Sequence, residues 1–403
     1  MQEPAGVRVL VITPSFPVPE TGAEQGDRAA GIRQLRRLGC EVSVIAKIMP
    51  HADEVLAQEA AAAWGVSLTL IPYTNLSGLR KLLGMLRNPL YFDGAAYEYA
   101  DPVLRQAITD EVKRFNPQIA WFDYTYLWPT YSFFKRKGIP IVTRSHNFEP
   151  EHFLEEEGKS LINLLKFIPK FFGELRTIRS STTLLAITPQ ERDVYDRLGA
   201  RKASVLPLRT LPSYLAMPVR EAADRSILHV FFMGSSYNVP HNRAAAQLVI
   251  EHIAPAAHLA YPGQFVFHIF GAKLPKELVA RCDGQSVIYE GYVDNTTLNE
   301  KLQAMDLALM PSLLGAGMQQ KIFEPLARGI PTIASPRAIA GYGFRSGEEY
   351  VAADTKEEYL QALGAMRELA FRQKLSRAAR VRSEELFSQA ALDAVIRETL
   401  HTI

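Results

Sequence analysis

The chain has 403 residues, more than one hydrophobic core usually accommodates, so two domains are expected. Apolar residues make up 47% of it and charged residues 22%, which is the composition of a globular protein. Lys and Arg together number 45 against 43 for Asp and Glu, a net charge of +2. This balance argues against nucleic acid as the main partner, because domains that bind it usually carry a strong basic excess.

Cysteines and apolar runs indicate the compartment. The two cysteines, Cys40 and Cys282, are far apart, which excludes a disulfide scaffold and fits a reducing environment. No apolar run of the sequence approaches the roughly 20 residues that a membrane-spanning helix needs. The first apolar run, Val7 to Ile12, is too short for the core of a signal peptide. The sequence therefore predicts a cytoplasmic protein that touches a membrane only from its inner surface.

In the first half of the chain, short apolar runs rich in β-branched residues alternate with segments of helical periodicity. The runs predicted to be strands are residues 7–13, 40–46, 66–72, 118–124, 139–145 and 182–188. Segments such as residues 29–38 lie between them and predict amphipathic helices. Because strand–helix alternation is typical of parallel sheets covered by helices, residues 1–206 are predicted to form a Rossmann-like domain.

The alternation pauses and then restarts. Residues 207–226 contain three prolines and little periodicity, which predicts a linker. Further strands are predicted at residues 227–234, 264–271, 286–293, 306–312 and 330–335. A second domain is therefore predicted at residues 227–385, followed by a last helix, residues 386–403, that returns toward the first domain. The predicted fold is α/β, with two doubly wound Rossmann-like domains that face each other across a ligand-binding cleft.

Several ligand classes lack their sequence motifs. Residues 14–31, after the first strand, have too many prolines and the wrong glycine spacing for a dinucleotide-binding loop. The sequence contains no Walker-type phosphate loop, no Gly-x-Ser-x-Gly turn and no Asp-x-Asp, and its nine histidines form no helical pair at metal-ligand spacing. Neither a metal nor a cofactor is therefore predicted.

One stretch, GAGMQQKIFEPLARGIP at residues 315–331, does predict a binding site. Gly315 and Gly317 follow the predicted strand 306–312, and a helix beginning near Met318 would point its first amide groups at the strand ends. Such an arrangement favours phosphate, and Gly317 allows phosphate to approach closely because it has no side chain.

Three polar residues of this helix share one face, because they lie three and four positions apart: Gln320, Lys321 and Glu324. Lys321 can neutralise phosphate charge, and Glu324 can accept hydrogen bonds from the vicinal hydroxyls of a ribose. A helix that merely exposes its polar face to solvent is the alternative, and Pro325 weakens the helix prediction because it lacks a backbone donor.

This stretch resembles the donor-site helix of the family-4 retaining glycosyltransferases (glycosyl transferase group 1 type), enzymes of the GT-B fold. Further matches follow in the family's order along most of the chain. They are TRSHNFEPEHF (143–153), FMGSSYNVPHN (232–242), FGAK (270–273) and YEGYVD (289–294). Each match is short, but their order at predicted strand ends makes the resemblance specific.

The resemblance implies roles for individual residues. Glu324 matches the glutamate that binds the donor ribose in relatives. The family's other glutamate, which holds the transferred sugar, falls at Ala316, so backbone amides or Gln319 and Gln320 are expected to replace it, and the sequence does not identify the sugar. The other residues implied in donor binding are Gly22, Gly234, Ser235, Asn242, Lys273, Tyr292, Val293, Gly315, Gly317, Met318 and Lys321. For Lys273, an ordinary solvated lysine is the alternative.

His146 follows the predicted strand 139–145 and is expected to face the cleft. In relatives the matching histidine contacts the donor sugar near the reacting carbon, so His146 and Lys321 are the predicted catalytic residues. A histidine satisfied by local hydrogen bonds is the alternative. The resemblance implies sugar transfer with retention from a nucleotide-diphosphate sugar, a UDP-sugar being expected, without a metal. No side-chain nucleophile stands out in the sequence, which favours attack on the same face, with the leaving phosphate accepting the proton.

Two basic amphipathic segments bear on the acceptor. Residues 79–92 place leucines on one stripe beside Arg80, Lys81 and Arg87, and residues 159–179 spread leucines and phenylalanines over a wide arc beside lysines and arginines. Such segments suit an anionic membrane surface. They predict a saccharide or lipid-linked saccharide acceptor and a role in cell-surface polysaccharide or glycoconjugate synthesis. Helices that face the core, with their basic groups reaching solvent, are the alternative.

Two other functions stay open at this point. The alanine at position 316 is compatible with a nucleotide-sugar epimerase or hydrolase on the same fold. The third possibility is a non-catalytic two-domain ligand-binding protein. The polar face formed by Lys321 and Glu324 argues against it, as does the lack of a signal-peptide pattern.

Overall fold

The computed structural model describes residues 6–20, 22–49, 52–73, 83–86, 88–93, 95–312, 318 and 320–403. The chain divides into two compact units. The N-terminal unit comprises Met1–Thr210 and Gln389–Ile403, and the C-terminal unit comprises Leu211–Ser388. The chain thus passes from one unit to the other within residues 207–226, for which a linker was predicted.

The N-terminal unit is built on a seven-stranded sheet with the order β3-β2-β1-β4-β5-β6-β7. Its strands are β1 (Arg8–Ser15), β2 (Glu41–Ile48), β3 (Ser67–Pro72), β4 (Ile119–Phe122), β5 (Ile141–Arg144), β6 (Thr183–Ala186) and β7 (Ala203–Val205). All neighbouring strands are parallel. The strand order reverses direction between β1 and β4, which makes this pair the topological switch point of the sheet.

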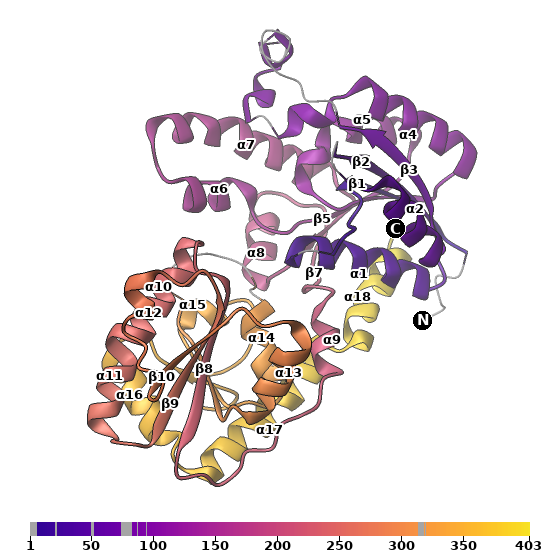
Figure 1. The fold of residues 1–403 in the computed structure, drawn as a ribbon. Coiled ribbons are helices and arrows are strands. Elements are labelled where there is room, and N and C mark those ends of the chain that lie inside the picture. The colour runs from indigo at the N-terminus through magenta and orange to yellow at the C-terminus, as the bar shows by residue number, and fades with distance from the viewer. Residues whose placement is uncertain are drawn as a thin grey trace. The chain divides into compact units, whose positions relative to one another are not determined.

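Helices accompany this sheet on both sides (Figure 1). The α-helices are α1 (Ala23–Arg37), α2 (Glu54–Ala63), α4 (Pro102–Phe115), α5 (Tyr131–Lys137), α6 (Glu149–Glu157), α7 (Leu161–Ser180), α8 (Pro189–Arg197) and α18 (Gln389–His401). Short 3₁₀ segments are η1 (Pro89–Asp93), η2 (Ala96–Tyr99) and η3 (Thr125–Thr130).

The core of the N-terminal unit explains its apolar strands. Side chains alternate along β1, so Val9 and Val11 pack into one apolar cluster, and Leu10 and Ile12 pack into another on the opposite face. Because both faces are buried, the strands read as continuous apolar runs. Helix α18 adds Leu392 and Ile396 to the first of these clusters.

Helix α18 is also held to helix α1 by polar contacts. The amide of Gln34 donates to Asp393 Oδ1 over 2.8 Å, and the guanidinium of Arg37 reaches the same oxygen over 2.7 Å. In Figure 1 the yellow α18 accordingly lies beside the indigo α1. The end of the chain therefore belongs to the N-terminal unit.

The C-terminal unit contains a six-stranded sheet with the order β10-β9-β8-β11-β12-β13. Its strands are β8 (Leu228–Ser236), β9 (Phe265–Ala272), β10 (Val287–Gly291), β11 (Leu307–Met310), β12 (Thr332–Ala334) and β13 (Val351–Ala352). They too are parallel. The strand order reverses between β8 and β11, so the fold-class prediction of two doubly wound Rossmann-like sheets is confirmed.

The helices of this unit follow the strands as a doubly wound sheet requires. They are α9 (Leu211–Leu215), α10 (Pro240–Leu248), the π-helical turn η4 (Val249–Ile253), α11 (Ala254–Ala260), α12 (Lys276–Val279), α13 (Asn295–Ala304), α14 (Gln320–Ala327), α15 (Pro336–Ile339), α16 (Lys356–Ala365) and α17 (Leu369–Phe387). Val230 and Phe232 of β8 share one apolar cluster with residues of α10, α11 and α16. The sheet therefore presents rigid strand ends to the loops that follow them.

Candidate functional site

Parallel strands carry their ligand sites beyond their carboxyl ends, at the switch point where a crevice opens between neighbouring loops. In the C-terminal unit this point lies between the loop after β8 and the loop after β11. In the N-terminal unit it lies between the loop after β1, which leads into α1, and the loop after β4. The predicted site residues can be examined at these two places.

Lys321 and Asn242 meet across the switch point of the C-terminal unit. Lys321 Nζ, in the first turn of α14, donates to Asn242 Oδ1 of α10 over 2.5 Å, although 79 residues separate them in the chain. Asn242 is fixed in turn, because its Nδ2 donates to the carbonyl of Ser236 at the end of β8 over 3.0 Å. Two residues from separately predicted segments thus form one polar contact.

The environment of Lys321 is unusual for a lysine. Its ammonium group lies 5.9 Å from the centre of the Phe232 ring, and its side chain is half-buried. Burial disfavours the charged form and lowers the pKa of Lys321 from 10.5 to about 8. Asn242 carries no charge to offset this cost. An anion that reached Lys321 would therefore relieve an electrostatic deficit.

The strand ends beside this contact come close together. A Cβ on Gly271 would lie 2.0 Å from the carbonyl oxygen of Gly234, so glycine at position 271 is what lets the ends of β8 and β9 approach. Gly271 has a φ of 138°, and Lys273 has a φ of 63°, in the left-handed region that non-glycine residues rarely adopt. Such strained backbone is common at ligand sites. Lys273, which directly follows β9, lies at the same edge of the sheet as Gly234.

Glu324 is held by a residue that was not predicted. Arg328, one turn further along and continuing from the end of α14, donates from Nε and Nη2 to Glu324 Oε1 over 3.0 and 2.7 Å. Arg328 is buried, and its Nη2 also contacts Asn299 of α13. Among the residues that the structure describes, no donor reaches Glu324 Oε2. The sequence argument had considered only Lys321 as a protein partner for this carboxylate.

Some of the remaining predicted donor residues of this unit are described by the structure, and others are not. Ser235 and Tyr292 are exposed, Val293 and Gln320 are half-buried, and Met318 is buried. Helix α14 is described from Gln320, two residues after the predicted start near Met318, and Pro325 lies within it. Gly315, Ala316, Gly317 and Gln319 lie outside the described residues. The phosphate-binding role of the glycine turn therefore stays a prediction.

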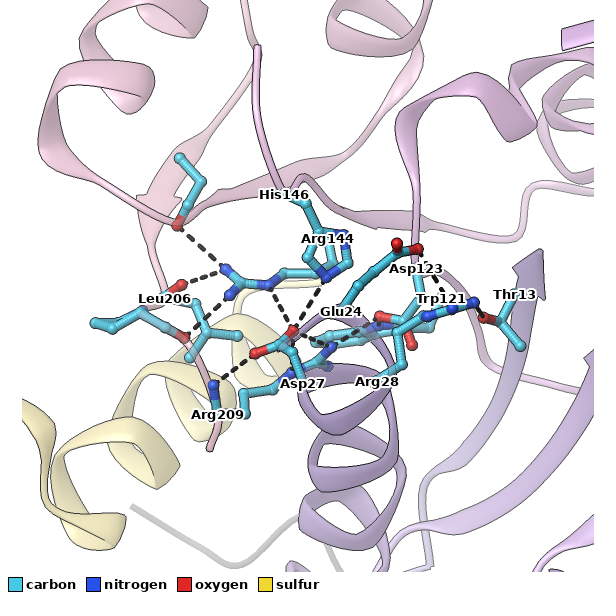
Figure 2. A network of polar contacts seen from close by, with 12 residues as sticks. Thr13, Glu24, Asp27, Arg28, Trp121, Asp123, Arg144, His146, Leu206 and Arg209 are labelled. Atoms are coloured by element: carbon cyan, nitrogen blue, oxygen red, sulfur yellow. Dashed lines mark hydrogen bonds and ion pairs between the residues drawn. The ribbon is translucent and has the colours of Figure 1, made fainter. Parts of the chain in front are cut away.

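In the N-terminal unit, His146 lies two residues beyond β5 and is 7% exposed. Its Nε2 lies 3.3 Å from Asp27 Oδ2 of helix α1 (Figure 2). Its ring centre is 5.1 Å from that of Tyr124, which follows β4. His146 Nδ1 is buried, and no hydrogen-bond partner for it lies in the part of the chain that the structure describes.

Asp27 is the centre of a buried network of charges, as Figure 2 shows. Its Oδ1 accepts the backbone N–H of Arg209 over 2.6 Å, and its Oδ2 accepts the guanidinium of Arg209 over 3.1 and 2.8 Å. Arg144 Nε lies 3.6 Å from the same Oδ2. Arg209 also reaches Asp123 Oδ1 over 3.2 Å, and this oxygen accepts the indole N–H of Trp121.

These contacts decide the ionisation of Asp27. Burial alone would raise the pKa of its carboxyl group, but the charges of Arg209 and Arg144, with the contact to His146, outweigh burial. The pKa of Asp27 is therefore held well below its usual value. Asp27 is an ionised, acceptor-only group at neutral pH.

Glycines of helix α1 make room for this network. A Cβ on Gly31 would lie 1.9 Å from Arg209 Nη1, so Arg209 can cross the helix only where a side chain is missing.

Gly22, a predicted donor contact, is the N-cap of α1 with a φ of 110°, and its carbonyl accepts the N–H of Gly26. Arg28, one residue after Asp27, donates to Thr13 Oγ1 and to the carbonyl of Ser15, each over 3.1 Å. These contacts fix α1 against the end of β1.

The contacts of Asp27 and Arg209 were not predicted, because 182 residues separate the two and no local pattern joins them. The pairing of Glu324 with Arg328 did have a signal, since a spacing of four places both on one helix face. In the described ranges, no group of three His, Cys, Asp or Glu side chains is arranged to hold a metal ion.

Fold and site together define a two-unit protein with a cation–amide contact at the switch point of the C-terminal unit and a buried histidine–carboxylate contact beyond the strand ends of the N-terminal unit. Residues 228–368 match the family model described as Glycosyl transferases group 1, and residues 29–209 match the one described as Glycosyl transferase 4-like domain. The chain belongs to the group 1 glycosyltransferases, and the predicted family is confirmed.

Solved structures with the same fold cover nearly the whole length of the chain. Sucrose-phosphate synthase from Thermosynechococcus elongatus is 14% identical, with a TM-score of 0.64 and 98% of each chain covered. HepE from Anabaena, in complex with UDP and glucose, is 15% identical with a TM-score of 0.60, over 98% of this chain and 100% of that one. A glycosyltransferase from Rickettsia africae is 13% identical with a TM-score of 0.62, over 98% of each. No curated protein sequence matches this chain. At these identities the likeness establishes the GT-B fold.

Proposed function

We propose that this protein is a retaining glycosyltransferase that moves a sugar from a nucleotide-diphosphate sugar to a saccharide or lipid-linked saccharide. The observation that carries the proposal is the contact between Lys321 and Asn242 at the switch point of the C-terminal unit. A half-buried lysine that is paired with no carboxylate of the described residues, at the place where this fold binds ligands, suits a diphosphate. UDP is the expected nucleotide, and support comes from HepE, a protein of the same fold whose structure contains UDP and glucose.

The proposed chemistry assigns each unit a task. Lys321 stabilises the negative charge that develops on the diphosphate as the sugar leaves, and no metal ion is needed for this. The acceptor attacks on the face from which the diphosphate departs, and the leaving phosphate accepts its proton. His146 contacts the transferred sugar. This route requires no pair of catalytic carboxylates, which a glycoside hydrolase would need.

Direct binding and turnover test the proposal. Nucleotides and nucleotide sugars are screened by thermal shift, because a ligand at 100 times its Kd adds about 2.7 kcal/mol to the stability of the folded state. UDP and one UDP-sugar are expected to raise the melting temperature. Release of UDP from that sugar is then measured with and without saccharide and lipid-linked acceptors. Release that does not depend on an acceptor would identify a hydrolase, and no release with any of them would favour a binding protein.

The second carboxylate oxygen of Glu324 fits a ribose. Arg328 holds Oε1 and leaves Oε2, which no described donor reaches, for the ribose hydroxyls. We expect Glu324→Gln to weaken UDP binding by about 2 kcal/mol, roughly 30-fold, because it replaces a charge-assisted hydrogen bond by a neutral one. Calorimetry with UDP and with its 2′,3′-dideoxy analogue measures the difference.

The analogue separates recognition from general damage, as in a double-mutant cycle. The loss caused by Glu324→Gln is expected to shrink for the dideoxy nucleotide, which has no hydroxyls to bind. Glu349→Gln is the matched control, since Glu349 is another buried glutamate of this unit and is paired with Arg345. An equal loss with both nucleotides would mean that Glu324 only supports Arg328.

The acceptor side of the proposal rests on helix α7. Along this helix, apolar side chains are exposed at Leu161, Ile162, Leu164, Leu165, Ile168 and Phe172. Lys159 and Lys166 are exposed beside them. An apolar face with flanking lysines fits an anionic membrane surface. In the described residues, no helix is long and apolar enough to cross a membrane. The segment 79–92 contributes less evidence, because Arg80, Lys81 and Arg87 lie outside the described residues.

We therefore expect the protein to co-sediment with vesicles that contain anionic lipid, and more weakly at high salt, which screens the lysines. Replacing Leu161 and Leu165 together by serine should lower binding at least ~10-fold, because burial of one leucine contributes about 1.5–3 kcal/mol. Leu259→Ser is the control, since Leu259 is 83% exposed on the C-terminal unit. Equal binding by the double variant would contradict this docking surface, and with it the argument for a lipid-linked acceptor in surface polysaccharide synthesis.

A further inference from the structure

His146 has one ring nitrogen engaged and one without a partner. Nε2 lies 3.3 Å from Asp27 Oδ2. Nδ1 is buried and lacks a hydrogen-bond partner within the described residues. A buried polar atom without a partner is costly, so each one calls for an explanation, such as a catalytic role or a bound water or ion.

We propose that Asp27 is a positioning residue for His146, whose carboxylate accepts the Nε2 proton and so keeps Nδ1 unprotonated as an acceptor. In a neutral imidazole one nitrogen is a donor and the other an acceptor, and the partner of the first decides which is which. Nδ1 then accepts a hydrogen bond from a hydroxyl group of the transferred sugar. That the partner of Nδ1 is a sugar hydroxyl rests on the proposed function. The tautomer of His146 rests only on its contact with Asp27.

The network of Figure 2 gives Asp27 the rigidity that this role needs. Its Oδ1 is anchored by the backbone N–H of Arg209 over 2.6 Å, so the carboxylate cannot rotate away from His146. Its Oδ2 is shared by Arg209 and His146. Both oxygens accept from donors, and the ionised carboxylate has no proton to give. The hydrogen between Asp27 and His146 must therefore come from Nε2.

A second carboxylate supplies a matched comparison. Asp123 is as deeply buried as Asp27 and accepts from the same guanidinium, that of Arg209. It accepts from Trp121 as well, and no described contact joins it to His146. Asp27→Asn and Asp123→Asn thus each remove one negative charge from the same network, but only the first changes the partner of the histidine. An asparagine can donate as well as accept, so it permits both tautomers.

Nitrogen NMR of the histidine rings tests the proposal directly. Protein with ¹⁵N-labelled histidine is measured at about pH 8, well above the usual histidine pKa of about 6.5, and His146→Gln identifies the signals of His146. The expected wild-type spectrum shows Nε2 protonated and Nδ1 unprotonated. Asp27→Asn is expected to give a mixture of tautomers, and Asp123→Asn to keep the wild-type tautomer. A wild-type ring protonated at Nδ1 would overturn the proposal, even if Asp27→Asn failed to fold.

Kinetics separate positioning from a merely structural role. With a wild-type enzyme that transfers sugar, Asp27→Asn is expected to lower kcat at least tenfold while the Kd for UDP changes less than twofold. If Asp123→Asn changes the tautomer as much as Asp27→Asn does, the effect belongs to the whole cluster and the proposal fails. If the wild-type protein transfers no sugar but shows the Nε2-protonated ring, the proposed function fails and the role of Asp27 as a positioning residue stands.

Discussion

Replacing His146 by alanine is expected to lower the turnover of sugar transfer by roughly 10²–10³, the range found when one preorganised polar contact to a transition state is removed. The position of His146 gives the reason. It lies beyond the carboxyl end of β5 in the N-terminal unit, beside Asp27 and Tyr124, and it presents a buried nitrogen without a described partner. Nucleotide binding should change less than twofold, because Lys321 and Glu324 belong to the other unit.

Two measurements decide the outcome. Initial rates of UDP release with acceptor give the turnover, and calorimetry with UDP gives the affinity. His152→Ala is the control, since His152 lies in α6 and, like His146, within residues 143–153. If nucleotide affinity falls as much as turnover does, His146 belongs to the nucleotide site. Normal turnover would show that its role is structural.

The fold could be predicted because its strands are buried on both faces. Each predicted apolar run of β-branched residues contains most of a strand, and alternation with helical segments then defines a doubly wound sheet. The two strands that were not predicted, β7 and β13, have only three and two residues. Neither strand holds a fully buried side chain, and neither is long enough to stand out as an apolar run.

The site was predictable only in part, and distance along the chain explains which part. His146, Asn242 and Lys321 follow strands or begin helices, where the rule that ligands bind beyond strand ends places candidate residues, and the family resemblance was needed to single out Asn242 and the role of His146. Neither Asp27 nor Arg209 follows a strand directly. Asp27 lies within helix α1, and Arg209 lies in the segment that was predicted to be a linker. Their pairing exists only once the sheet brings residues 182 positions apart into contact.

Gly31 is a second residue whose role could not be predicted from its local sequence. Gly31 lies inside helix α1, where glycine costs up to about 1 kcal/mol relative to alanine. Nothing nearby in the sequence accounts for it. The guanidinium of Arg209 does, because any side chain at position 31 would overlap it. Local propensity therefore identified the helix but not the reason for its glycine.

Replacing Lys321 by methionine, which has a similar length and no charge, is expected to weaken UDP binding by about 1.5–3 kcal/mol, roughly 10- to 150-fold. At the switch point of the C-terminal unit the lysine donates to the neutral Asn242 over 2.5 Å, and no carboxylate of the described residues is paired with it. A diphosphate would supply the negative charge that this site lacks. Lys356→Met is the control, since Lys356 is an exposed lysine of the same unit.

The dependence of affinity on pH tests the same residue in the wild-type protein. Burial lowers the pKa of Lys321 to about 8, so the ammonium form becomes scarce as the pH rises through that value. A diphosphate binds the ammonium form better, and affinity should therefore fall between pH 7.5 and pH 9.5. The terminal phosphate of the nucleotide does not titrate in this range, because its pKa of about 6 leaves it already ionised there.

Stability without ligand should depend on pH in the opposite direction. The pKa of Lys321 is about 8 in the folded chain and 10.5 as its ordinary value, so between these values the unfolded chain binds more protons. The contribution of Lys321 to the free energy of unfolding therefore rises with pH over that interval. Binding of UDP should favour the protonated form of Lys321, so the complex takes up protons near pH 8. Calorimetry in buffers of different ionisation enthalpy should detect this proton uptake. Uptake that persists in Lys321→Met would assign the proton to another group and remove Lys321 from the phosphate site.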